Sequence, residues 1–245
     1  MSTANPPASH NGAPVETLHD SVREPVLRET TRARVLLVDD HPIVRQGLSR
    51  LINSEPDLIV CAEAASAEQA LEAVEKHNPS IAIIDIQLDG FDGIELIKLL
   101  RQRKPDLPML VLSMHDESIY AERVLRAGAR GYVTKQQASE KVMTAIRHVL
   151  SGEIYVSEKI AAKLLHALAG SKPTLGESPL QRLSDRELQV FRLLGGGGTV
   201  RQIATKLGLS VKTVETHREH IKTKLNIETS SELLRYAIEH EVNGG

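Results

Sequence analysis

A chain of 245 residues with a formal net charge of −2 is long enough for two domains of ordinary size, and its charge alone indicates no class of partner. Apolar residues make up 41% and charged residues 25%, which is typical of a globular protein with a buried core. No apolar run approaches the ~20 residues that span a bilayer, and the N-terminus lacks the pattern of a secretory signal. A single cysteine excludes an intramolecular disulfide, and no His/Cys cluster has the spacing of a zinc site. These features predict a cytoplasmic protein with no membrane association.

Residues 1–32 are rich in Ser, Thr, Asn, Pro and charge and show no apolar periodicity. Such a composition cannot bury enough apolar surface to offset the entropy of ordering. We therefore expect a disordered tail.

Residues 33–152 alternate short apolar runs with amphipathic stretches, five times over about 120 residues. This alternation is typical of an α/β doubly wound fold, in which helices cover both faces of a five-stranded parallel sheet. The predicted strands are RVLLV (34–38), LIVCAEA (58–64), IAIID (81–85), MLVLS (109–113) and GYVT (131–134).

Residues 153–179 combine a helical piece with a segment that Pro173, Gly176 and Pro179 interrupt, so we expect a linker there. Residues 180–245 contain four helix patterns and no strand pattern, which predicts a small all-α domain. Ser184 and Glu187 have the spacing of a capping box at the first of these helices.

The two predicted domains differ in charge. Residues 34–155 carry 14 Lys/Arg against 18 Asp/Glu, giving −4, whereas residues 180–245 carry 10 against 8, giving +2. The sign suits an acidic module joined to one that meets nucleic acid.

Polar residues end the predicted strands. Asp39 and Asp40 follow the first strand, Asp85 ends the third, Ser113 ends the fourth and Lys135 follows the fifth. Ligands of doubly wound sheets bind at the carboxyl ends of the strands, so these side chains should share one pocket. Three carboxylates repel unless a hard divalent cation such as Mg²⁺ joins them. A hydroxyl and an ammonium suit the other oxygens of a phosphoryl group, for which a central aspartate is a candidate nucleophile.

Four motifs at these positions resemble the signatures of the response-regulator receiver domain: LLVDDHP, IIDIQLDGFDG, VLSMHDE and GARGYVTK. The resemblance covers residues 34–150. It implies a flavodoxin-like fold with Asp85 as phosphoacceptor, and Mg²⁺ held by Asp85, Asp39, Asp40 and the backbone carbonyl of Gln87. It further implies that Ser113 and Lys135 contact the phosphoryl group and that Tyr132 is the aromatic side chain that switches rotamer on activation.

One residue departs from the receiver pattern. Receivers usually carry proline four residues after the phosphoacceptor, where this sequence has Asp89. We expect a more mobile loop and altered metal affinity or phosphoryl lifetime there, with the directly reacting residues all present.

Within residues 180–245, QIATKLGLSVKTVETHREHIKTKL reads as helix, tight turn, helix. Gly208 suits a left-handed helix end and Ser210 an N-cap, so a helix should span 211–225. Its core-facing side should carry, at least in part, Val214, His217, Ile221 and Leu225, while charged and hydroxyl side chains face outward, as in a DNA-recognition helix. Side-chain packing or plain exposure is expected for His217 and His220, rather than metal binding.

The block at 181–240 resembles the LuxR-type helix-turn-helix. That resemblance implies that the third helix enters the major groove, that the fourth is available for dimerisation and that Glu187 is a buried acid bracing the scaffold. Glu215 and Glu219 either accept hydrogen bonds from cytosine amino groups or are surface residues that make no contact with a base. The implied DNA-contacting residues are Thr213, Glu215, Thr216 and Glu219 toward bases, and Lys212, Arg218, Lys222 and Lys224 toward phosphates or groove walls.

Together the two resemblances imply a two-component response regulator of the NarL/FixJ-like class. A sensor histidine kinase would phosphorylate Asp85 with Mg²⁺, and a homodimer would then bind double-stranded DNA, with RNA polymerase as a further candidate partner. Two alternatives stay open: a phosphorylation-independent DNA-binding regulator with a drifted receiver, and a magnesium-dependent phosphohydrolase. The second would make the protein an enzyme, but Asp39-Asp40-His41 lacks the usual nucleophile-x-acid spacing. We therefore predict a regulator and not an enzyme.

Overall fold

The computed structural model describes residues 1–4, 32–88, 91–169 and 178–243. The chain divides into two units, Met1–Thr31 and Arg32–Gly245. The predicted disordered tail, except for its ends, and residues 170–177 of the predicted linker lie outside the described residues.

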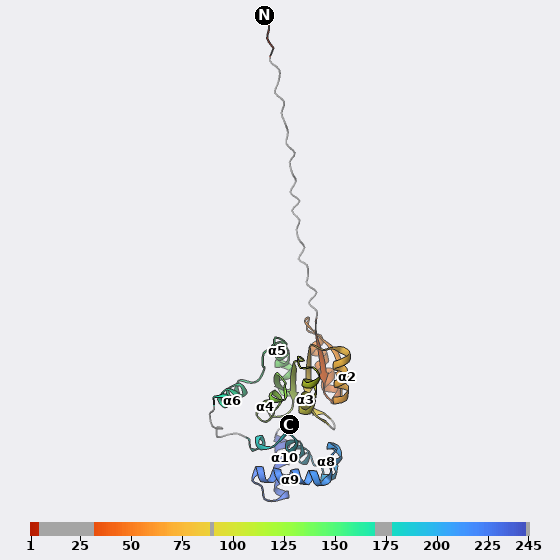
Figure 1. Cartoon of the computed structure of the whole chain (residues 1–245), viewed down its shortest axis with the longest axis vertical. Coiled ribbons are helices and arrows are strands. Elements are labelled where there is room, and N and C mark those ends of the chain that lie inside the picture. The colour runs from red at the N-terminus through yellow and green to blue at the C-terminus, as the bar shows by residue number, and fades with distance from the viewer. Residues whose placement is uncertain (5–31, 89–90, 170–177, 244–245) are drawn as a thin grey trace. The chain divides into compact units, whose positions relative to one another are not determined.

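Five parallel strands form the central sheet, as predicted (Figure 1). Their order is β2-β1-β3-β6-β7, the flavodoxin-like order, in which the strand order reverses between β1 and β3. Every neighbouring pair in this sheet is parallel. The strands are β1 (Ala33–Val38), β2 (Leu58–Ala64), β3 (Ile81–Asp85), β6 (Met109–Ser113) and β7 (Gly131–Thr134).

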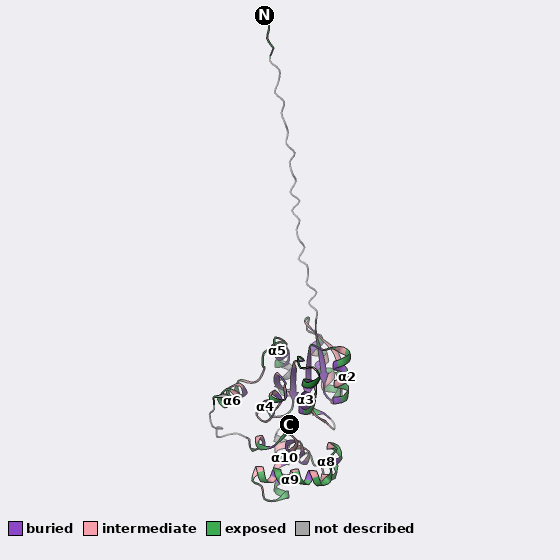
Figure 2. Cartoon of the chain, viewed as in Figure 1, coloured by how far each residue is buried: buried purple, intermediate pink, exposed green. Residues whose placement is uncertain are grey.

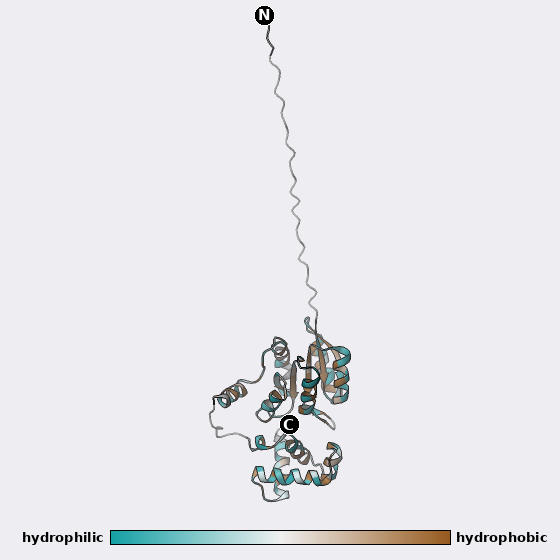
Figure 3. Cartoon of the chain, in the orientation of Figure 1, coloured by the Kyte–Doolittle hydropathy of each residue, from teal (hydrophilic) through white to brown (hydrophobic). Residues whose placement is uncertain are grey.

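Helices cover both faces of this sheet because alternate strand residues point to opposite sides. Val35 and Leu37 of β1 pack with helices α1 (Pro42–Asn53) and α5 (Ala138–Leu150). Leu36 and Val38 pack with α2 (Ala67–His77), α3 (Gly93–Arg103) and α4 (Glu117–Ala127). Strands β1, β3, β6 and β7 are therefore largely buried on both sides (purple in Figure 2) and apolar (brown in Figure 3), whereas most residues of the edge strand β2 are half-buried. This is the reason that their sequences are continuous apolar runs.

A short antiparallel hairpin, β4 (Gln87–Leu88) with β5 (Phe91–Asp92), lies between β3 and α3 and was not predicted. In the sequence an Asp-Gly pair, which is a signal for a hairpin, separates the two strands. The strands themselves are too short to show the alternating pattern of longer strands. A 3-10 turn, Lys135–Gln137, leads from β7 into α5.

The C-terminal part is entirely helical where described, as predicted. After α6 (Glu158–Leu168) come a 3-10 turn (Pro179–Arg182) and the helices α7 (Asp185–Gly195), α8 (Val200–Leu207), α9 (Val211–Leu225) and α10 (Ser230–Asn243). Leu188 and Phe191 of α7, Ile203 of α8, Ile221 of α9 and Leu233 of α10 are among the buried residues that form its core.

The predicted helix ends of this part are confirmed. Ser184 and Glu187 form a capping box at α7, Gly208 ends α8 with φ 63°, and the Ser210 hydroxyl accepts the Thr213 N–H at the start of α9. A second capping box, Thr199 with Gln202 at α8, was missed. No helix among the described residues is long and apolar enough to cross a membrane.

Candidate functional sites

Four strand ends bring their polar side chains to one edge of the sheet, as the sequence predicts. Asp39 follows β1, Asp85 ends β3, Ser113 ends β6 and Lys135 follows β7. Asp39 and Asp85 are each 3% exposed, and Ser113 is fully buried. Buried charge at this edge requires compensation within the pocket.

Lys135 supplies that compensation. Its Nζ lies 2.6 Å from Asp39 Oδ2 and 2.7 Å from Asp85 Oδ2. Burial raises the pKa of Asp85, and the charge of Lys135 offsets this only in part. Burial by itself would lower the pKa of Lys135, but the charges and hydrogen bonds of Asp85 and Asp39 outweigh it and raise that pKa. The ammonium therefore stays charged between two carboxylates, where it can meet an incoming anion.

The pocket retains unused acceptor capacity. Asp40 Oδ1 is buried and accepts no hydrogen bond from any described residue, although His41 Nδ1 lies 2.6 Å away. One ligand atom from each of Asp39, Asp40, His41 and Asp85 falls within a 4.8 Å group. A compact set of carboxylate oxygens with an unsatisfied buried member fits a hard divalent cation. His41 was not among the metal ligands predicted from the sequence.

Ser113 and Tyr132 lie beside this group. Ser113 Oγ accepts the backbone N–H of His115 at 3.2 Å. The Tyr132 ring is buried, and its hydroxyl donates to the carbonyl oxygen of His115 at 2.8 Å. Burial raises the pKa of Tyr132, so its hydroxyl remains a donor. Both side chains thus contact the same short segment after β6.

The segment after Asp85 is closely packed. The Gln87 N–H donates to Asp85 Oδ1 at 3.2 Å, and Asp92 caps α3 through the Ile94 N–H. A Cβ atom on Gly93 would lie 2.5 Å from the Asp85 carbonyl oxygen, so only glycine fits there. This constraint was not predicted, because the Asp-Gly pair at 92–93 is only a weak signal for it in the sequence. Asp89, the residue in place of the usual proline, lies outside the described residues.

The second candidate site is the outward face of α9. Val214 and Ile221 are buried as expected, which fixes the rotation of the helix. Lys212, Thr216 and Glu219 are exposed at spacings of three and four, so they share the opposite face. Glu215 is exposed next to them, and Thr213 is half-buried at the first turn.

Three predicted cationic contacts lie toward the flanks of α9. Arg218, Lys222 and Lys224 are half-buried. Lys222 Nζ lies 2.8 Å from Glu219, and Lys224 Nζ lies 2.6 Å from Glu187. The charge of Lys224 is therefore engaged inside the helical part, whereas the side chain of Lys212 is exposed on the outward face.

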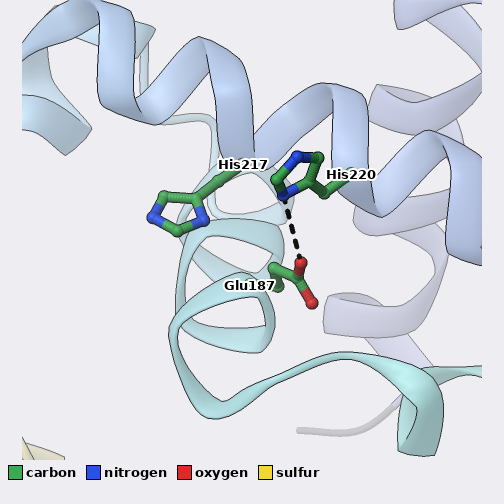
Figure 4. Close-up of side chains that lie close together, drawn as sticks. All are labelled: Glu187, His217 and His220. Atoms are coloured by element: carbon green, nitrogen blue, oxygen red, sulfur yellow. Dashed lines mark ion pairs between the residues drawn. The ribbon is translucent and has the colours of Figure 1, made fainter.

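Glu187 is the buried acid of the helical part, 4% exposed. Its Oε2 accepts both the Ser184 backbone N–H of the capping box at 2.7 Å and the Lys224 ammonium. Burial would raise the pKa of Glu187, but these hydrogen bonds hold it below the usual value. His217 and His220 of α9 lie beside it (Figure 4).

Comparison with known proteins tests the predicted family. A model described as "Response regulator receiver domain" matches residues 35–147, and one described as "Bacterial regulatory proteins, luxR family" matches residues 181–237. The oxygen regulatory protein NreC of Staphylococcus epidermidis is 35% identical over 214 residues, which cover 85% of this chain and 98% of that protein. The chain belongs to the LuxR-type response regulators. The predicted family and fold are thereby confirmed.

Other relatives of this response regulator point the same way. The response regulator GacA of Pseudomonas aeruginosa is 35% identical over 207 residues, covering 84% of this chain and 96% of GacA. A structure of RcsB from Salmonella enterica serovar Typhimurium, bound to promoter rprA in the presence of the phosphomimetic BeF3−, matches with a TM-score of 0.65. Its sequence identity is 28% over 85% of this chain and 99% of that one. These relatives are regulators and not enzymes, as predicted.

Proposed function

We propose that this response regulator binds double-stranded DNA under the control of phosphorylation on Asp85. The observation that carries the proposal is the convergence of Asp85, Asp39, Ser113 and Lys135 at one edge of the sheet. A structural role alone does not explain why a lysine, a hydroxyl and buried carboxylates meet at four successive strand ends.

The chemistry expected at this pocket is phosphoryl transfer to a carboxylate. An oxygen of Asp85 forms a bond to phosphorus while the bond from phosphorus to the donor breaks and the donor leaves with its electrons. Lys135 is placed to neutralise one phosphoryl oxygen and Ser113 to donate to another. Asp39, Asp40, Asp85 and the Gln87 carbonyl would hold Mg²⁺, which neutralises phosphoryl charge when bound.

Signal transmission is assigned to Ser113 and Tyr132. Both contact the backbone at His115, through Ser113 Oγ and the Tyr132 hydroxyl. If Ser113 turns its hydroxyl to a phosphoryl group, the N–H of His115 loses its acceptor and Tyr132 must adjust with it. This couples the pocket to the segment that leads into α4.

Binding to DNA is assigned to α9. Its exposed residues Lys212, Glu215, Thr216 and Glu219 occupy the face opposite the core. Thr213, Arg218, Lys222 and Lys224 complete the proposed set toward bases, phosphates and groove walls. The DNA complex of the similar RcsB protein supports this assignment.

The proposed partners follow from this function. A sensor histidine kinase would donate the phosphoryl group to this cytoplasmic regulator, and RNA polymerase would meet the regulator when it is bound to DNA. A homodimer would place two recognition helices about one helical turn of DNA apart. Leu234 and Ile238 of α10, each 42% exposed and four residues apart, offer an apolar stripe for the second copy.

The deciding experiment measures phosphoryl incorporation from acetyl phosphate into the wild type, Asp85→Asn and the exposed control Asp106→Asn, with and without Mg²⁺. We expect Mg²⁺-dependent labelling of the wild type and Asp106→Asn, and none of Asp85→Asn. DNA affinity is measured before and after labelling, and it should rise only in the two proteins that are labelled.

Other outcomes contradict particular parts of the proposal. An unlabelled but folded wild type would favour the phosphorylation-independent alternative. Labelling that turns over on small phosphomonoesters with release of phosphate would favour the phosphohydrolase. Labelling of Asp85→Asn would place the acceptor elsewhere.

A further inference from the structure

The helical part contains a cluster of potential metal ligands away from the pocket at the sheet edge. Glu187 of α7 and His217 and His220 of α9 each offer one ligand atom, and these atoms lie within 4.8 Å of one another (Figure 4). We propose that this cluster binds a zinc ion that joins α7 to α9. Among the described residues, only one other group of this kind occurs, the acidic pocket itself.

The distances require little rearrangement. Zinc bonds of about 2.0–2.2 Å in a tetrahedral shell place the ligand atoms roughly 3.4 Å apart. Glu187 Oε1 and His220 Nδ1 are already 3.7 Å apart. The His220 side chain is 59% exposed, so it can turn inward without displacing its neighbours. Two hydrogen bonds hold the Glu187 carboxylate, and His217 is half-buried, so the exposed His220 closes onto two less exposed ligands.

The polar atoms of the cluster leave acceptor capacity for a metal. Glu187 Oε2 accepts the Ser184 N–H and the Lys224 ammonium, whereas the one contact of Oε1 with a described residue is that with His220. His217 Nδ1 is buried and has no hydrogen-bond partner in the part of the chain that the structure describes. A buried nitrogen without a partner is costly, and coordination would remove that cost if His217 turns this atom to the metal.

The ligand types favour zinc over the magnesium proposed for the receiver pocket. Imidazole nitrogens suit zinc and neighbouring transition metals, while magnesium prefers oxygen. Two histidines and one glutamate leave a fourth position for water, an established zinc ligand set. The ammonium of Lys224, 2.6 Å from Glu187, opposes a cation. Its side chain is 39% exposed and can swing into solvent, so the site should bind zinc with moderate affinity.

The position of the proposed zinc site between α7 and α9 determines which properties of the protein zinc would change. His217 lies on the flank of α9 between the buried Val214 and Ile221 on one side and the exposed Thr216 and Glu219 on the other. A metal there would tie the proposed recognition helix to the capping box of α7 without occupying the outward face. Zinc should therefore stabilise the helical part and leave the DNA-facing side chains free.

The test is calorimetric titration of the full chain with Zn²⁺ in excess Mg²⁺, comparing the wild type with His220→Gln, His217→Gln, His41→Gln and His148→Gln. His41 belongs to the acidic pocket, and His148 is an exposed histidine of α5. We expect one zinc equivalent to be lost, or bound at least tenfold more weakly, in both His220→Gln and His217→Gln. Zinc should raise the melting temperature of the wild type but not of these two variants.

Three results bear on the assignment. Retention of wild-type zinc binding in His220→Gln and His217→Gln overturns it, as does loss of that binding in His41→Gln, which would locate the zinc in the receiver pocket. Loss in His148→Gln as well would indicate adventitious surface binding and equally overturn it. Replacing zinc by Co²⁺ adds a check independent of stability, because the visible absorption of the bound cobalt should be absent in His220→Gln. His220 is exposed, so its replacement should leave the far-ultraviolet circular dichroism unchanged.

Discussion

The carboxylate of Glu187 is almost fully buried, and it serves both the α7 capping box and the Lys224 ammonium. A hydrogen bond to a charged group contributes about 1.5–3 kcal/mol. Glu187→Gln keeps an oxygen for the Ser184 N–H but loses the charge, and it should lower the free energy of unfolding by roughly that amount. Urea unfolding in the presence of a chelator measures it.

The stability of the protein should also depend on pH through Glu187. Its pKa in the folded state lies below the usual 4.5, so the unfolded chain binds the proton more readily. The stabilisation is complete above pH 4.5 and is lost as the pH falls through the lower, folded value. Stability of the wild type should therefore fall more steeply than that of Glu187→Gln below pH 4.5. Parallel pH profiles for the two proteins would contradict this.

Gly93 packs against the backbone of Asp85 and Ile86 and should not tolerate a larger residue. In Gly93→Ala the new methyl group would lie 2.5 Å from the Asp85 carbonyl oxygen and 2.6 Å from Ile86 Cα, and both are backbone atoms. The segment after the proposed phosphoacceptor must shift, at a cost of about 1–3 kcal/mol. Phosphoryl incorporation should fall together with stability.

Gly47→Ala is the matched control. Gly47 lies within α1, and a Cβ atom there meets nothing within 4 Å. Alanine is the better helix former, so this change should raise stability by about 0.5–1 kcal/mol and leave labelling intact. Equal behaviour of the two variants would show that the close approach at Gly93 is unimportant.

The first turn of helix α9 depends on its N-cap residue, Ser210. The Ser210 hydroxyl accepts the Thr213 N–H, so Ser210→Ala leaves that donor at the helix start without its partner. We expect a loss of about 0.5–2 kcal/mol in stability and weaker DNA binding, because the first turn carries Lys212 and Thr213. Ser231→Ala, at an exposed position of α10, should change stability by less than about 0.5 kcal/mol. Circular dichroism melts and DNA titrations of both variants provide the comparison.

The elements also show what a sequence can predict. The central strands were predictable because burial on both faces makes each a continuous apolar run, and their polar ends identified the pocket. The ends of α7, α8 and α9 were predictable because Ser184, Gly208 and Ser210 act locally. These features depend on neighbours within a few residues.

The features that the sequence did not reveal depend on distant residues or on short elements. The β4–β5 hairpin has two residues in each strand, too few for any periodicity to emerge. Glu187 and His220 meet only because α7 packs on α9, and no spacing rule connects them. Likewise, the space available at Gly93 is set by the backbone path after β3. Each of these required the three-dimensional arrangement.

At the scale of the whole molecule, DNA binding should depend strongly on salt, because cations that meet phosphates displace condensed counterions. Lys212→Gln should reduce the magnitude of the slope of log affinity against log salt by about 1 on any duplex. Lys159→Gln, exposed on α6, is the control and should leave the slope unchanged. Titrations at several salt concentrations decide this, and an unaltered slope in Lys212→Gln would remove Lys212 from the set of phosphate contacts.

The proposed homodimer is tested at the same scale. Leu234→Asp with Ile238→Asp places charge on the exposed apolar stripe of α10 and should shift the phosphorylated protein toward monomer, with weaker binding to a two-half-site DNA. Leu165→Asp, at a 66% exposed position of α6, serves as the control. Sedimentation analysis gives the oligomeric state, and dimers that persist in the double variant would exclude this stripe as the interface.

The outward face of α9 carries side chains of both charge signs, so DNA phosphates attract some of them and repel others. Glu215 and Glu219 stand beside Lys212 on the surface proposed to enter the groove. Each carboxylate is satisfied only where a cytosine or adenine amino group lies within its reach, and elsewhere it faces base acceptors and phosphates. The repulsion is therefore relieved only where the base sequence places an amino group opposite both Glu215 and Glu219. A regulator built this way would spend less of its time trapped on irrelevant DNA, so fewer copies per cell would suffice to keep its operators occupied.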